Sequence, residues 1–491
     1  ADINPELFAE DVAEPAGPAD DLKAEITLSP DCPLLAFVGL PVEPLTDVTA
    51  RALLDAASGM MSVDVSAPYL RMNDKLIEST SLSATLDARQ RRTSLDAFTM
   101  FPAKGGVVAL TIASNGLDGR HDSDVSWTNR SGRNHGSFRF STGFDRNDDG
   151  QLTTDIDVNP GEIVFNDTVW NIKPSKIAIA KDLISVSRFE ISHAEQLVSI
   201  NGAVSRDPDQ RLQLRLRDID LNYVFETLNI SSNVMFGGYA TGTISASNLF
   251  SRTPEVYTSD LFVKDLAYNH AVMGDGHIES AFHPDSGAIT IDAVISQANG
   301  GKSIINGSIT PVGEKLDFRF HADRANVAFL KPFMSAFCDN ITGQASGDAH
   351  LFGTFKLLDM EGDIYGENLK MTLGLTGTTY TATDSVHIRP GRIEFENIEL
   401  HDASGHTALL SGLLTHKSFH DPVFEFRVTD ARNFLCYDVK ENMEHPWYGK
   451  VYGTGLVTIK GRPGLVDINA DMATTAGTDL SLIHISEPTR P

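Results

Sequence analysis

Apolar and polar residues alternate along most of this chain, and a period of two is typical of β-strands with one face turned away from water. Three of the alternating segments carry an arginine between two apolar residues. They are Leu214, Arg215 and Leu216, then Phe318, Arg319 and Phe320, then Phe426, Arg427 and Val428. Turn-forming sequences such as RDPDQ and HPDSG lie between the strands. The pattern predicts a mainly β protein with antiparallel strands.

Helical patterns are few and short. An amphipathic pattern predicts a helix over residues 45–58. Two briefer patterns, NYVFETLN at 222–229 and NVAFLKPFM at 326–334, predict short helices later in the chain. Helices of this number are too few to cover the apolar faces of so many strands.

An internal repeat is the most informative feature of the sequence. The segment that begins INGAVSRDPDQRLQLRLRDID at Ile200 matches INGSITPVGEKLDFRFHADRAN and then LSGLLTHKSFHDPVFEFRVTDARN. Its glycines, Gly202, Gly307 and Gly412, are 105 residues apart. About thirty residues further on, each repeat reaches a GxxxG motif and a strand. These motifs are Gly238 with Gly242, Gly343 with Gly347, and Gly449 with Gly453. Each repeat is therefore predicted to run strand, turn, strand, short helix, GxxxG, strand.

The repeated glycines allow two interpretations. They give room for tight turns or bulges where strands meet, or they mark places where a ligand approaches the backbone. The first interpretation is the expected one, and it makes these nine glycines structural.

The repeat divides the chain into six predicted segments. They are an acidic linker with a short helix at 1–59, less regular β modules at 60–199, β repeats at 200–304 and 305–409, a partial β repeat at 410–480, and a tail at 481–491. The tail, SLIHISEPTRP, resembles translated sequencing-adapter sequence and is predicted to be non-native.

A sheet with one apolar face must bury that face. Two arrangements would do so: the sheet closes on itself as sandwiches or barrels, or it curls into a long trough whose apolar inside holds an oily molecule. Leu214, Leu216, Phe318, Phe320, Phe426 and Val428 are the predicted lining of such a trough. The alternative is that these six side chains fill the closed core of a sandwich.

The GxxxG strands, the INGSI and LDFRF block and the segment GTGLVTIKGRPGLVDINADM resemble the translocation and assembly module TamB, in the AsmA-like superfamily, and most of all its Bacteroidetes-type members. The resemblance covers roughly residues 60 to 480 and rests on loose hydrophobic and glycine patterns. It implies a long curled antiparallel β-sheet, groove-like in section and built of repeats of about 105 residues with a few short helices.

The resemblance also implies a function. Proteins of that family are anchored in the inner membrane by an N-terminal helix, which this sequence lacks, and they span the periplasm. They are implicated in phospholipid transfer between the two membranes and in outer-membrane protein assembly. The implied partners are phospholipid acyl chains and an outer-membrane assembly protein of the Omp85 type. On this expectation the chain is an internal fragment of a non-enzymatic bridge; the alternative is a structural or adhesive protein of the cell surface, built of β-sandwich repeats.

Charge and composition exclude some partners. The chain has 66 acidic and 40 basic residues and a formal net charge of −26, so it is repelled by phosphate backbones, and no nucleic acid is expected to bind. Apolar residues make up 41%, which is enough for a folded protein. Three cysteines, far apart, give no disulfide framework.

Candidate chemistry is sparse. Asp145, Asn147, Asp149 and Gly150 match positions of a calcium loop, but Ile156 stands where a bidentate Glu is needed. A polar turn is therefore predicted there, with weak calcium binding as the alternative. The sequence contains no nucleophile elbow, phosphate loop or zinc-binding motif in the required context. We therefore expect no catalytic residues, no metal site and no cofactor.

Overall fold

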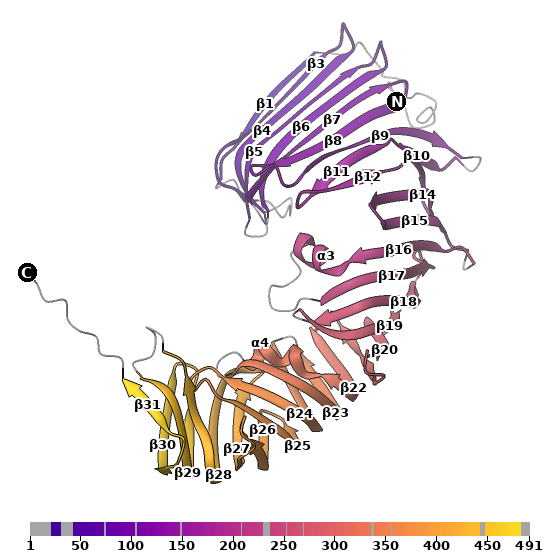
Figure 1. Cartoon of the computed structure of the whole chain (residues 1–491). Helices are drawn as coiled ribbons and strands as arrows, with labels where there is room; N and C mark the ends of the chain where they lie inside the picture. Colours follow the sequence, from indigo (N-terminus) through magenta and orange to yellow (C-terminus); the bar gives the residue numbers. More distant parts are fainter. Residues whose placement is uncertain are drawn as a thin grey trace, which may run out of the picture. The chain divides into compact units, whose positions relative to one another are not determined.

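The computed structural model describes residues 21–30, 43–72, 75–103, 106–147, 150–207, 209–228, 236–251, 253–268, 270–334, 338–354, 356–441 and 447–482. Its strands form a single antiparallel sheet of 31 strands with very few helices. Figure 1 shows these strands following one another in chain order within each part of the molecule. The predicted fold class, a long curled antiparallel β-sheet, is confirmed.

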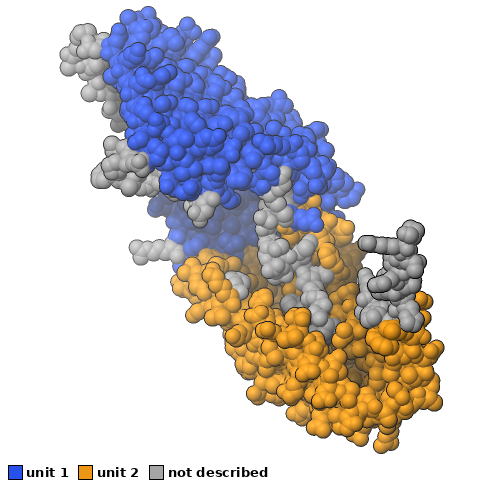
Figure 2. Space-filling view, turned by 90° about the vertical axis from the view of Figure 1, so that its left-hand side faces the viewer, with its two compact units in different colours: residues 1–219, 226–230, 241–256 blue, residues 220–225, 231–240, 257–491 orange. Residues whose placement is uncertain are grey.

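The chain splits into two compact units (Figure 2). Unit 1 comprises residues 1–219, 226–230 and 241–256, and unit 2 comprises residues 220–225, 231–240 and 257–491. The division falls inside the first predicted repeat, and the repeat boundaries themselves stay predictions.

The strands before this division are β1 (Leu22–Leu28), β2 (Glu43–Pro44), β3 (Val48–Asp55), β4 (Met60–Met72), β5 (Lys75–Asp87), β6 (Arg92–Ala103), β7 (Gly106–Leu117), β8 (Arg120–Asn129), β9 (His135–Arg146), β10 (Leu152–Val158), β11 (Gly161–Phe165), β12 (Thr168–Ile172), β13 (Ser175–Ala180), β14 (Leu183–His193), β15 (Gln196–Val204) and β16 (Leu212–Asp220).

The later elements are α3 (Leu221–Leu228), β17 (Phe236–Ser247), β18 (Glu255–Tyr268), β19 (Ala271–His283), β20 (Ala288–Ser296), β21 (Lys302–Thr310), β22 (Lys315–Asn326), η1 (Val327–Leu330), α4 (Lys331–Met334), β23 (Cys338–Thr354), β24 (Leu357–Leu373), β25 (Thr379–Arg389), β26 (Arg392–His401), β27 (Thr407–Lys417), β28 (His420–Val439), β29 (Trp447–Arg462), β30 (Leu465–Thr474) and β31 (Asp479–Leu482).

Nearly every strand pairs with its neighbours in sequence, so the sheet is a meander. The exceptions come from strands that are interrupted. β10 and β11 both pair with β9 on one side. On the other side, β10 pairs with β13 and β11 pairs with β12. Pro160 and Pro174 occupy the two interruptions, and proline cannot donate a hydrogen bond to a neighbouring strand. The four short strands therefore make one long hairpin.

A bulge recurs along the sheet at matched places. In seven even-numbered strands one residue adopts φ of 49–56°, and its backbone N–H donates to a polar side chain of the following strand. The pairs are Arg188 with Asn201, Asp218 with Thr241, Asp265 with Asp275, Arg324 with Ser346, Asn368 with Thr383, Asn397 with Ser411 and Asn433 with Thr454, at N···O distances of 2.9–3.1 Å.

These bulges shape the sheet. Six of the seven coincide with a register shift in which one strand has one residue more than its partner. Such a residue bends its strand and increases the local twist. The side-chain acceptor satisfies the N–H that the bulge removes from the ladder. The bulges therefore bend the long strands without leaving these backbone donors unpaired.

Two of the predicted short helices are confirmed. Helix α3 begins after Asp220, whose carboxylate accepts hydrogen bonds from the N–H groups of Asn222 and Tyr223 at 2.9 and 3.4 Å. Helices η1 and α4 begin after Asn326, whose side chain accepts from the N–H of Ala328 at 3.0 Å. Asp and Asn are favoured at this capping position because they satisfy donors that the first helical turn leaves open.

Two sequence predictions were wrong. The predicted helix at 45–58 is instead strand β3, which pairs with both β1 and β4; its apolar residues also fit a period of two, and two neighbouring strands override helix propensity. The helix predicted in the third repeat is also wrong, because the matching residues belong to β28, which continues to Val439 through three register shifts against β29. Ser481 and Leu482, the first two residues of the tail predicted to be non-native, pair with β29 as part of β31; residues 483–491 lie outside the described residues, and the non-native origin of the tail stays a prediction.

The bulges predict a selective effect of β-branched residues. Replacing Asn368 with Val should destabilise the β24–β25 region by about 1–2 kcal/mol, because a branched side chain is strained at positive φ. Hydrogen exchange of peptides that span residues 357–389 measures the effect. Glu367→Val, at the exposed neighbouring position without positive φ, is the matched control. Equal loss of protection in the two variants would contradict the bulge assignment.

Candidate functional site

An unbroken row of apolar residues and glycine crosses unit 2 on one face of the sheet. Residues paired across antiparallel strands share a face, so the row can be followed through the strand register. From β18 to β30 it contains Leu261, Ile278, Ala293, Ile305, Phe320, Ala349, Gly362, Ile388, Ile393, Leu414, Phe424, Gly461 and Val466. Thirteen strands thus present one apolar strip.

The opposite face is polar at the adjacent position. The residues next to those of the apolar row, from β19 to β24, also pair with one another across the strands. They are Glu279, Asp292, Asn306, Arg319, His350 and Glu361. The sheet of unit 2 therefore has an apolar face and a charged face, as the period of two predicts.

Unit 1 repeats this arrangement independently. From β1 to β9, one row contains Ile26, Ala50, Val65, Leu82, Ala97, Ile112, Val125 and Phe138. The adjacent row on the other face contains Glu25, Arg51, Asp64, Ser83, Asp96, Ala113, Asp124 and Arg139. A depression of about 260 Å³ lies on the apolar side of β4–β6, where Met61, Val63, Ala84, Leu86 and Leu95 line it.

The six predicted lining residues lie on these apolar faces. Leu214 and Leu216 belong to β16 in unit 1, where they pair with Ile200 and Val198. The other four, Phe318, Phe320, Phe426 and Val428, share one face of unit 2. All six are half-buried, between fully covered and open. None is fully buried, although Val428 packs against the buried cluster around Phe434.

The arginines between these residues lie on the polar face. Arg215, Arg319 and Arg427 lie directly opposite Ser199, Asn306 and Ser411 in the strand register. Their cross-strand partners on this side are therefore uncharged.

Two stretches of the apolar face in unit 2 are covered. Near η1 and α4, Leu330 and Met334 pack with Val327, Cys338 and Ile341 over the start of β23. Further on, a cluster of Ile398, Leu400, Ala408, Ala431 and Phe434 is at most 7% exposed. The apolar face is thus closed at these places and half-open between them.

Tyr380 closes the second cluster. Its ring stacks on Phe434 with centroids 4.9 Å apart, although β25 and β28 are separated by two other strands. Its hydroxyl donates to the carbonyl of Leu435 at 2.9 Å, and burial raises the pKa of Tyr380 well above its usual value. This contact could not be predicted from the sequence, because it joins residues 54 positions apart in different strands.

A buried carboxylate fixes the turn beside this cluster. Burial alone raises the pKa of Asp402, but the N–H groups of Leu435, His406 and Ser404 and the His406 ring donate to the carboxylate. These hydrogen bonds, 2.8–3.0 Å long, outweigh burial and hold the pKa of Asp402 below its usual 3.8. Asp402 therefore ties the β26–β27 turn to β28.

All nine predicted structural glycines lie inside strands. Gly202 is in β15, Gly238 and Gly242 in β17, Gly307 in β21, Gly343 and Gly347 in β23, Gly412 in β27, and Gly449 and Gly453 in β29. Gly307 and Gly412 lie opposite Phe318 and Phe426, and a Cβ at either glycine would overlap the facing ring and backbone. The phenyl rings thus occupy the space that the glycines leave.

The first glycines of two of the three GxxxG motifs face bulges, whereas the third, Gly449, faces the backbone of Asp479 in β31. Gly238 and Gly343 have φ of 112° and 128°. A Cβ at Gly238 would lie 2.9 Å from the carbonyl oxygen of Asp265, and one at Gly343 would lie 2.7 Å from that of Asn368. Both carbonyls belong to bulged residues, so these glycines admit a neighbouring backbone. This is the bulge interpretation predicted from sequence.

The candidate calcium loop forms the turn between β9 and β10. Asn147 accepts from the N–H of Gln151 through its side chain and from the N–H of Gly150 through its carbonyl, both at 2.8 Å. Asp149 lies outside the described residues. Within the part of the chain that the structure describes, no group of three or more His, Cys, Asp or Glu side chains is arranged to hold a metal ion.

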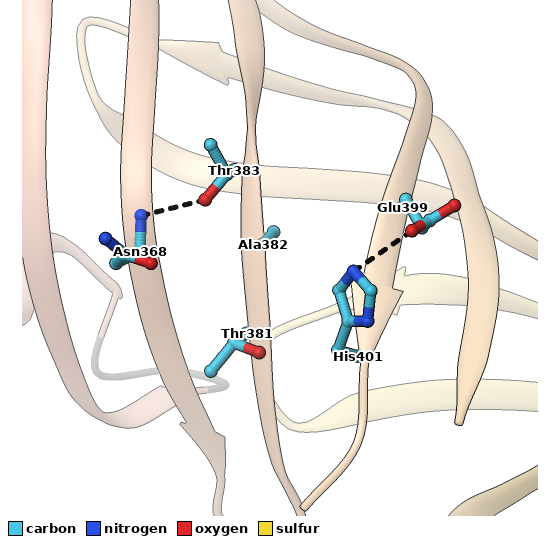
Figure 3. A pocket seen from close by; sticks show the side chains of 6 residues that line it. All are labelled: Asn368, Thr381, Ala382, Thr383, Glu399 and His401. Carbon is cyan, nitrogen blue, oxygen red and sulfur yellow. Dashed lines mark hydrogen bonds and ion pairs between the residues drawn. The ribbon is translucent and has the colours of Figure 1, made fainter. Parts of the chain in front are cut away.

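A small polar pocket of about 260 Å³ lies in unit 2 (Figure 3). Asn368, Thr381, Ala382, Thr383, Glu399 and His401 line it. Two interactions occur among them: the Asn368 N–H donates to the Thr383 hydroxyl at 3.0 Å, and His401 Nε2 lies 3.0 Å from Glu399 Oε1. The pocket is thus the space beside one of the bulges, with a single histidine–carboxylate pair.

No family model, curated protein or solved structure matches this chain. Among the described residues, no helix is both long enough and apolar enough to cross a membrane.

The glycine and phenylalanine pairs predict a strong position effect. Gly307→Ala should destabilise the protein by about 1–3 kcal/mol, because the added methyl group overlaps the Asp317 carbonyl and the Phe318 ring. Gly143→Ala, where nothing lies within 4 Å of the new methyl group, should leave the protein as stable or slightly more stable. The urea midpoint of β-sheet circular dichroism measures both. Equal midpoints would contradict the close packing at Gly307.

Asp402 predicts a local loss of structure in acid. Because its pKa is lowered in the folded state, its contribution to stability is present above about pH 4 and is lost as pH falls through the lowered pKa. Hydrogen exchange of residues 402–406 and 431–435, corrected for the intrinsic rate, should accelerate over that range. Asp402→Asn should already show fast exchange at pH 7. Loss of protection near pH 6 would instead implicate a histidine.

Proposed function

We propose that this chain is a non-enzymatic segment of a lipid-carrying bridge, and that its apolar face holds phospholipid acyl chains while the headgroups stay in water. The observation that carries the proposal is the unbroken apolar row across thirteen strands of unit 2. Since neighbouring strands are about 4.8 Å apart, the row extends roughly 60 Å along the sheet.

The exposure of this face also supports the proposal. The six lining residues are half-buried, so part of each side chain stays open to solvent. Exposed apolar surface of this extent is unfavourable unless something covers it. An acyl chain gains about 0.8 kcal/mol for each CH₂ removed from water, so it would stabilise the face while being held by no single deep site.

The six sequence-predicted residues take the role of lining in this proposal. Phe318 and Phe320 have ring centroids 6.3 Å apart, and Phe426 contacts Phe395 and Phe424 at 5.5 and 5.6 Å. These rings give wide apolar contact without polar groups. The clusters around Val327 and Phe434 would bound the half-open stretch that lies between them.

The wider role follows the TamB-like resemblance. We place the chain in the periplasm as part of a protein anchored in the inner membrane, with phospholipid transfer and outer-membrane protein assembly as its function and an Omp85-type protein as its outer-membrane partner. A structural or adhesive protein of the cell surface is the alternative. That alternative requires β-sandwich modules, in which two sheets pack face to face, whereas the described strands form one sheet.

Charge on the apolar face should remove bound lipid. We expect the double variant Phe318→Glu, Phe320→Glu to carry at least about tenfold less phospholipid than the parent chain, because a carboxylate beside acyl chains must lose its water. Native mass spectrometry of the purified protein measures the lipid that accompanies it.

The matched control is Arg319→Glu, in the same strand but on the polar face. It changes the net charge by the same two units and should keep the bound phospholipid. Circular dichroism establishes that both variants are folded. Unchanged lipid content in the double variant would refute the lining assignment, and absence of lipid from the parent chain would refute the function.

A further inference from the structure

The turns at one edge of unit 2 form a distinct surface. In an antiparallel meander, the turns that follow alternate strands all lie at the same edge. Turns after odd-numbered strands, from β19 to β29, belong to this edge. Together with the strand residues that flank them, they comprise residues 284–287, 311–315, 356–357, 389–392, 417–421 and 462–465, which we name the basic rim.

The basic rim has the opposite charge to the whole chain. It carries six basic side chains, Lys315, Lys356, Arg389, Arg392, Lys417 and Arg462, against three acidic ones, Asp285, Glu314 and Asp421. Its net charge is therefore +3 on a chain of −26. Electrostatic interactions in water are screened beyond about 8 Å at physiological ionic strength. A surface in contact with the rim therefore interacts with the charges of the rim and only weakly with the net charge of the whole protein.

Half of these cations have no counterion among the described residues. Lys356 lies 3.7 Å from Glu314, Arg389 lies 3.0 Å from Asp363, and Arg392 lies 2.7 Å from Glu394. Across the described parts of the chain, Lys315, Lys417 and Arg462 form no ion pair with an acidic side chain, and all three are exposed. They come from three different turns, spaced along the rim.

The same turns expose large aliphatic side chains. Val312 is 85% exposed, Leu357 is 72% exposed and Leu465 is 64% exposed. Each of them lies within three residues of a basic side chain of the rim: Lys315, Lys356 and Arg462 respectively. Apolar tips beside lysine and arginine are typical of surfaces that rest in the headgroup layer of a membrane.

The opposite edge of unit 2 lacks this combination. It also exposes an aliphatic residue, Leu375. Counted in the same way, with the strand residues that flank each turn, its described segments carry three basic and three acidic side chains, namely Lys302, Lys331, Lys440, Asp402, Glu441 and Asp479. The excess of positive charge thus belongs to one edge and does not follow from turns in general.

We propose that the basic rim of unit 2 docks on an anionic bilayer surface. The lysines and arginines contact lipid phosphates, and the tips of Val312, Leu357 and Leu465 enter the headgroup layer. The turns repeat every second strand, about 9.6 Å apart, so several headgroups are contacted at once. This docking uses the edge of the sheet and not its apolar face, and it goes beyond the lipid-carrying role proposed above.

Vesicle flotation tests the docking with the whole chain. Vesicles of phosphatidylglycerol and phosphatidylethanolamine should bind the protein, and vesicles of phosphatidylcholine alone should bind it far less. The variant Lys315→Glu, Lys417→Glu, Arg462→Glu should weaken binding to the anionic vesicles at least about a hundredfold, since each basic residue contributes about fivefold. Raised salt should weaken binding by the parent chain.

The control reverses three exposed lysines of the same unit that lie outside the rim: Lys264→Glu, Lys302→Glu and Lys370→Glu. It makes the same change in net charge and should retain binding. Equal loss in the two triple variants, or equal binding of the parent chain to both vesicle types, would overturn the proposal. The rim variant should keep its co-purified phospholipid, so failure of docking and failure of the lipid-carrying function give different results.

Discussion

The structure depends on one constraint: a single antiparallel sheet must keep its apolar side chains on one face over many strands. In a meander, the register passes from each strand to the next, so a slip of one residue would move every later apolar side chain to the charged face. The row from Leu261 to Val466 shows no such slip. Because each bulge adds its residue to one strand only and restores the alternation afterwards, the apolar face survives the bends.

Bulges and glycines work together to make this sheet. Long strands without bulges would form a flat sheet. A bulged residue at positive φ in every second strand bends the sheet at the same position along successive strands. The neighbouring strand meets the bulge with a hydroxyl, amide or carboxylate that accepts the N–H, and at Gly238 and Gly343 with a residue that has no side chain. Where strand β28 replaces the predicted helix of the third repeat, Tyr380 and Phe434 fill the same face.

Much of this could be predicted from sequence, and the limits have physical causes. Alternation predicted the strands and placed Phe318, Phe320, Phe426 and Val428 on one face, because side-chain direction in a strand depends only on sequence parity. The glycines predicted room for bulges, but the bulged residues themselves were not identified, although Asp or Asn in positions such as Asp265 and Asn368 was a usable signal. The contact of Tyr380 with Phe434 could not be predicted, since it depends on how far the sheet curls. The helix at 45–58 failed because pairing with β1 and β4 outweighs local propensity.

The central claim is that the apolar face contacts lipid and the charged face does not. The most direct test places photo-crosslinking residues one at a time along β22, from Leu316 to His321, in protein prepared from cells. The account predicts phospholipid adducts at positions 316, 318 and 320 and few at 317, 319 and 321, which is the period of two in the strand itself. Adducts without that period, or none at the three apolar positions, would contradict it.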